Sequence, residues 1–160
     1  SLLQTPDICI VGIDTASNHN QVVWERQTNA LLDSFRIYRE SNVSGVYDLI
    51  GSQHFSDLSV FEDVNSDPAQ QAYRYRITAV DTCGMETPPS PIHKTMHLTI
   101  NAGLGGSWNL IWDGYKGFNF EASALPEIDC HFIAGVNNVP RREPSAVLIN
   151  RKCGSYAGSG

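Results

Sequence analysis

The stretch from Ala72 to Asp81, AYRYRITAVD, constrains the fold of this chain more than any other part of the sequence. Bulky or apolar side chains recur at every second position, and most of the positions between them are more polar. A period of two over this length indicates a β-strand with one face toward a core. The next residues, Thr82-Cys83-Gly84-Met85, predict a turn. We therefore expect a central strand of a β-sandwich here.

Six further runs are typical of short strands separated by turn residues: 7–14, 21–25, 34–40, 47–51, 59–64 and 93–98. No stretch of about ten residues has the periodicity of a helix. Seven short strands with turn signals between them predict an all-β, immunoglobulin-like antiparallel sandwich, in which two sheets each bury one face.

Length and charge limit the functions that such a chain can have. Its 160 residues suit one domain, or one domain with part of another. The formal net charge of −6 argues against a nucleic-acid or anionic-membrane surface. The longest apolar runs are far shorter than the about 20 residues that span a bilayer. No basic and apolar leader precedes Pro6, so either a signal was removed or the chain is an internal fragment. We expect a fragment, because the opening SLLQTP resembles a linker that enters a strand.

Three motifs together resemble a fibronectin type III domain over residues 6–96: VVWE around Trp24, SFRIYR, and YRYRITAVDTCGMETPPS. The resemblance implies that Trp24 packs in the core. It also implies that Tyr73 forms a tyrosine corner, its hydroxyl bonding to upstream backbone. The core residues expected from this resemblance and from the alternation within the strands are Trp24, Phe35, Ile37, Tyr73, Tyr75 and Ile77.

A wider set of motifs, including ICIVGID and FEDVNSDP, is similar to modules found in tandem in exported bacterial surface proteins. That resemblance implies an extracellular or cell-surface location. It also implies that Cys9 and Cys83 lie at the same pole of the sandwich and form a disulfide. From the residues alone, the four cysteines could be disulfide-bonded or free thiols, and the pairing of Cys130 and Cys153 stays open.

The pattern starts again after Met96. LTINAG is strand-like, residues 103–106 predict a turn, and SWNLIWD repeats the strand with a tryptophan. We expect residues 97–120 to open a second, incomplete fibronectin type III-like unit. Residues 121–160 carry no counterpart of the later strands, so we expect a divergent or truncated segment with a flexible end.

No group of residues has the pattern of a catalytic site, so we expect no enzyme activity and no cofactor. The spacing of Asp63, Asn65 and Asp67 is similar to the start of a calcium loop. Pro68 follows where that loop carries its glycine, so an acidic turn is the preferred interpretation and calcium is a weak candidate.

The function that we expect is that of a non-catalytic spacer or adhesion element, whose partners are neighbouring domains of the same polypeptide. The alternative is a ligand-binding module that uses the loops at one pole to bind a surface protein or a glycan. The candidate ligand-binding residues in those loops are Leu31, Leu32, Phe55, Met85 and Glu86.

Overall fold

The computed structural model describes residues 3–117, and they form two packed antiparallel sheets followed by a β-hairpin. The strands are β1 Ile8–Ile13, β2 Asn20–Trp24, β3 Leu32–Glu40, β4 Tyr47–His54, β5 Val60–Asp63, β6 Arg74–Asp81 and β7 His93–Lys94. After them come β8 Leu98–Ala102, a short 3-10 turn at Leu104–Gly106, and β9 Trp108–Trp112. Within residues 3–117 no helix is long and apolar enough to cross a membrane.

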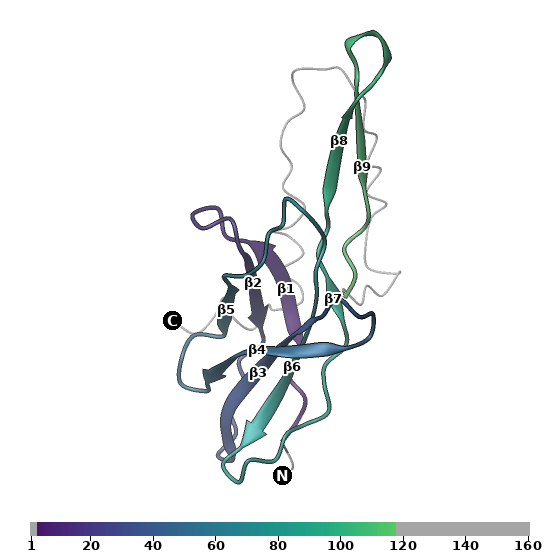
Figure 1. Ribbon diagram of the computed structural model, residues 1–160. Coiled ribbons are helices and arrows are strands. Elements are labelled where there is room, and N and C mark those ends of the chain that lie inside the picture. The colour runs from purple at the N-terminus through teal and green to yellow at the C-terminus, as the bar shows by residue number, and fades with distance from the viewer. Residues whose placement is uncertain (1–2, 118–160) are drawn as a thin grey trace, which may run out of the picture. The chain divides into compact units, whose positions relative to one another are not determined.

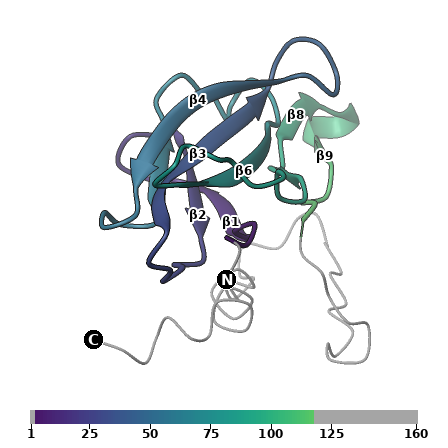
Figure 2. The same cartoon turned by 90° about the horizontal axis from the view of Figure 1, so that it is seen from below.

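The two layers have the strand orders β1-β2-β5 and β4-β3-β6-β7 (Figure 1). Figure 2 shows β4, β3 and β6 in one layer and β1 and β2 in the other. The strand predicted to be central, β6, pairs with β3 on one side and with β7 on the other. The all-β antiparallel sandwich predicted from the sequence is confirmed.

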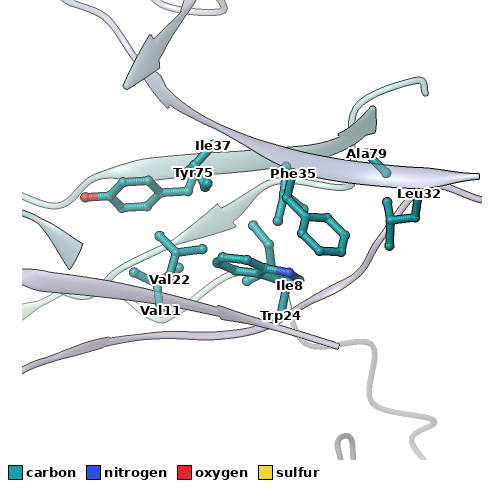
Figure 3. Packing of buried hydrophobic residues seen from close by; sticks show 10 residues of the cluster. Ile8, Val11, Val22, Trp24, Leu32, Phe35, Ile37, Tyr75 and Ala79 are labelled. Carbon is teal, nitrogen blue, oxygen red and sulfur yellow. The ribbon is translucent and has the colours of Figure 1, made fainter. Parts of the chain in front are cut away.

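The core is formed by alternate side chains from both sheets (Figure 3). Trp24 of β2 is fully buried, and its ring centroid lies 5.4 Å from that of Phe35 on β3. Ile37, Tyr75 and Ile77 are also 0% exposed, which is what the period of two in β3 and β6 requires. Burial of these aromatic and aliphatic side chains between the layers stabilises the sandwich.

The two tyrosines of YRYR have different roles although they are two positions apart and point to the same side of the chain. Tyr75 is fully buried, whereas Tyr73, just before the strand, is half-buried against the core. The Tyr73 hydroxyl accepts a hydrogen bond of 2.8 Å from the backbone N–H of Asp67, which is the upstream contact of a tyrosine corner. This bond ties the loop after β5 to the start of β6.

One buried ion pair connects the two sheets. The Arg39 guanidinium on β3 donates to both carboxylate oxygens of Asp63 on β5, at 2.9 and 2.7 Å. The Tyr75 hydroxyl donates to the same carboxylate at 2.8 Å and accepts from the Asn20 side chain at 3.0 Å. Burial, and then the charge of Asp63, raises the pKa of Tyr75, so its hydroxyl remains a donor. The network closes one end of the core.

The strand-like runs predicted after Met96 form the hairpin β8–β9, with the predicted turn between them. Its register pairs Leu98 with Trp112, Ile100 with Leu110, and Ala102 with Trp108. These six side chains share one face, because alternate pairs of an antiparallel ladder point the same way. The hairpin therefore has one wholly apolar face, but whether it opens a second sandwich stays a prediction.

Candidate functional site

The loops predicted to meet at one pole do lie together. The backbone N–H of Thr82 donates to the carbonyl of Leu31 at 2.9 Å, and that of Phe55 donates to the carbonyl of Asp33 at 3.0 Å. Three of the candidate side chains are open to solvent there: Leu31 is 46% exposed, Phe55 40% and Met85 69%. Ligand binding by this pole stays a prediction.

The choice of Leu32 as a ligand-binding residue is wrong. Leu32 is the first residue of β3, where its backbone pairs with Asp81, and only 2% of it is exposed. It belongs to the hydrophobic core, because β3 begins two residues earlier than the sequence suggested. The neighbouring Leu31 remains on the surface because it precedes the strand.

The predicted disulfide between Cys9 and Cys83 is also wrong. Cys83 is a free, exposed thiol in the turn after β6, whereas Cys9 is buried within β1. That turn is organised without a covalent link: the Asp81 side chain accepts from the N–H groups of Cys83 and Met85. Gly84 has φ of +84°, a conformation that glycine adopts without strain.

The weak calcium candidate does not present three ligands. The Asp63 carboxylate is 3% exposed and is already neutralised by Arg39. The Asp67 side chain accepts from the N–H of Ala69 and so caps its own turn. Among the residues that the structure describes, no group of His, Cys, Asp or Glu side chains lies where it could hold a metal ion. The Asp63 and Asp67 side chains are thus engaged within the protein, and the interpretation as an acidic turn stays a prediction.

The candidate Glu86 follows Met85 in the chain, but its side chain lies against the outer face of the four-stranded sheet. Its carboxylate accepts from Arg36 at 2.6 Å, from Tyr38 at 2.5 Å and from Thr78 at 2.5 Å. Partial desolvation opposes ionisation, but these hydrogen bonds outweigh it and lower the pKa of Glu86 below its usual value. Glu86 is therefore a fixed anion at the edge of a groove.

That groove, which we call the outer groove, has a volume of about 380 Å³ and is lined mainly by Tyr38, Tyr47, Arg76, Thr78 and Glu86. The outer groove was not predicted from the sequence. The sequence does contain a signal for this surface, because both central strands alternate polar and buried side chains. On β3, Arg36 and Tyr38 alternate with Phe35 and Ile37. On β6, Arg76 and Thr78 alternate with Tyr75 and Ile77. Two polar faces on paired central strands form one continuous surface.

A second feature missed from sequence is the junction, which we define as the contacts that hold Tyr115 and Lys116 on the sandwich. The Tyr115 hydroxyl accepts from the backbone N–H of Val11 at 2.8 Å and lies 2.7 Å from Nδ1 of His93. Lys116 and Lys94 exchange two backbone hydrogen bonds, at 2.8 and 3.1 Å. The chain that leaves through β7 and the hairpin is thus fastened back to β1 and β7.

Comparisons with known proteins concern the fold only. No protein-family model matches the chain, and no curated protein sequence matches it. Among solved structures, an Fn3-like protein from Clostridium thermocellum is 20% identical, with a TM-score of 0.44 over 57% of this chain and 90% of that one. A beta-1,2-glucanase from Parabacteroides distasonis is 19% identical, with a TM-score of 0.49 over 59% of this chain and 13% of that one. Pectate lyase PelI from Erwinia chrysanthemi is 13% identical, with a TM-score of 0.45 over 57% of this chain and 27% of that one.

The fold assignment rests on this chain's own geometry. A three-stranded and a four-stranded antiparallel sheet enclose a tryptophan from the second strand. A tyrosine before the sixth strand bonds to upstream backbone. The β-sandwich of this chain therefore has a fibronectin type III-like fold.

Proposed function

We propose that this chain is a non-catalytic module of a larger extracellular protein, in which it holds neighbouring parts of the polypeptide in a fixed position. The observation that carries the proposal is the junction. A spacer must transmit position from one element to the next, and a flexible exit from the sandwich would not do so. Tyr115 and Lys116 fix the outgoing chain by hydrogen bonds to Val11 and Lys94.

The chemistry of the described surface also favours a non-catalytic role. Glu86 is the carboxylate of the outer groove, and three donors hold it in its ionised form. A carboxylate with a lowered pKa is a weak proton acceptor, whereas a general base works best with a pKa near the operating pH. An extracellular setting is supported by the resemblance of the sequence motifs to modules of exported surface proteins.

Replacing Tyr115 with phenylalanine should loosen the junction. The variant keeps the ring but leaves the N–H of Val11, a residue that is 4% exposed, without its acceptor. We expect a loss of about 1–3 kcal/mol in the free energy of unfolding, the cost of an unsatisfied buried donor. The measurement that reports on the positioning role is the backbone order parameter of each amide, obtained from 15N relaxation. Amides of β8 and β9 should have order parameters of about 0.85 in the parent chain and lower values in the variant.

Tyr38→Phe is the matched control, because it also removes one tyrosine hydroxyl but on the outer sheet face. Its hairpin amides should keep the parent values. Order parameters below about 0.6 throughout the hairpin of the parent chain would show a flexible exit and would contradict a positioning role.

A further inference from the structure

The outer groove contains one cation, Arg76, that forms no direct ion pair with the part of the sandwich that the structure describes. Its anion, Glu86, is paired with Arg36. Glu40 is near enough to attract Arg76 electrostatically, but its carboxylate accepts its hydrogen bonds from Arg74 and from the backbone N–H of Gly45. Within residues 3–117, Arg76 forms no ion pair at all.

Arg76 is nevertheless held in place. Its guanidinium carbon lies 4.8 Å from the centroid of the Tyr47 ring, a cation–π contact that fixes the charge over β4. Two donors on this pair of side chains, Arg76 Nε and Tyr47 Oη, are buried and have no hydrogen-bond partner. A buried donor without an acceptor costs about 1–3 kcal/mol, so a site with two of them favours an incoming acceptor.

The shape of the groove and its other lining residues indicate which class of ligand could supply that acceptor. Tyr38 and Pro89 add apolar surface beside the hydroxyl of Thr78, in a groove of about 380 Å³. Apolar and aromatic surface with a few placed polar groups is typical of sites for small molecules. Peptides, by contrast, are commonly bound by main-chain pairing at a sheet edge. The main-chain groups of β3 and β6 are already paired on both sides, but Tyr47 belongs to the edge strand β4, so an acidic peptide is included as a counterpart in the test.

We propose that the outer groove binds a carboxylated sugar residue of an acidic polysaccharide. The carboxylate accepts hydrogen bonds from Arg76 and from the Tyr47 hydroxyl, and the sugar ring packs against Tyr38. A charge-assisted pair with a planar guanidinium selects a carboxylate over a neutral hydroxymethyl group. This role is separate from that of the junction, and either could fail without the other.

The test is an NMR titration of the full chain with D-glucuronate, with D-glucose as the neutral counterpart and with N-acetylglutamate amide as the acidic peptide counterpart. Glucuronate should shift the amides of Tyr38, Tyr47 and Arg76, and should bind at least about tenfold more tightly than either of the other two probes. If glucose bound as tightly as glucuronate, the carboxylate would not contribute to affinity and the proposal would be contradicted. Equal or tighter binding of N-acetylglutamate amide would show a site for acidic peptides.

Two variants and a control locate the site. Arg76→Gln should weaken glucuronate binding by about tenfold or more, the loss of one charge-assisted contact. Tyr47→Phe keeps the ring under the guanidinium but removes the hydroxyl, and should weaken binding several-fold. Arg26→Gln changes an exposed arginine after β2 that is outside the lining of the groove, and should leave the affinity unchanged. Parent-like affinity in Arg76→Gln would overturn the proposal.

Discussion

Replacing Trp24 with alanine should remove about 3–5 kcal/mol from the free energy of unfolding, the usual cost of deleting a buried aromatic side chain. Trp24 is fully buried and packs against Phe35 between the sheets. A domain of this kind is stabilised by only about 5–15 kcal/mol in total. The variant should therefore be largely unfolded, or should unfold at a much lower urea concentration, as followed by circular dichroism.

Trp108→Ala and Trp24→Phe are the controls for this experiment. Trp108 is 66% exposed on the hairpin, so its removal should change the free energy of unfolding by no more than about 0.5 kcal/mol. Trp24→Phe keeps an aromatic ring and removes an indole N–H that has no hydrogen-bond partner, so it should cost clearly less than alanine. Equal effects of Trp24→Ala and Trp108→Ala would show that the core is not built around Trp24.

Replacing Arg39 with methionine should cost about 3 kcal/mol. The substitution leaves the Asp63 carboxylate, which is 3% exposed, without its cation. Removing one partner of a buried ion pair costs about 3–5 kcal/mol, and the partial exposure of Arg39 places this case at the lower end. Urea unfolding of the variant measures the loss.

A double-mutant cycle separates the pair from its surroundings. Arg39→Met with Asp63→Leu should cost less than the sum of the two single changes, because the double variant buries no unpaired charge. Arg36→Met is the surface control: its pair with Glu86 is 39% and 27% exposed, and its loss should cost less than about 1 kcal/mol. An Arg39→Met cost no larger than that of Arg36→Met would show that Asp63 does not depend on its cation.

The parts of the fold that were predictable from sequence are those with a local signal. The period of two placed Phe35, Ile37, Tyr75 and Ile77 on inward faces, and all four are buried. The turn after β6 was visible from Gly84, because a glycine is suited to its positive φ. Leu32 was assigned to a loop because polar neighbours masked the start of β3, and only the pairing with Asp81 shows that the strand has begun.

The parts that were missed depend on contacts between distant residues. Tyr115 and Val11 are 104 positions apart, and no local pattern indicates that a phenol after the hairpin will reach β1. The outer groove combines β3, β4 and β6 with the segment after β6. Its polar residues were visible, but their convergence requires the register of the sheet. The pairing of Cys9 with Cys83 was taken from resemblance, and the free thiol of Cys83 shows that the resemblance did not extend so far.

Amide hydrogen exchange tests most directly whether the sandwich and the outgoing chain form one cooperative unit. The amides of Val11, Lys94 and Lys116 donate to Tyr115, Lys116 and Lys94 respectively. If the junction is part of the unit, they should exchange only through the global opening that exposes the amides of β6, with the same free energy and the same response to urea. Rapid exchange of all three while β6 remains protected would show that the chain leaves the sandwich untethered, and would contradict this account.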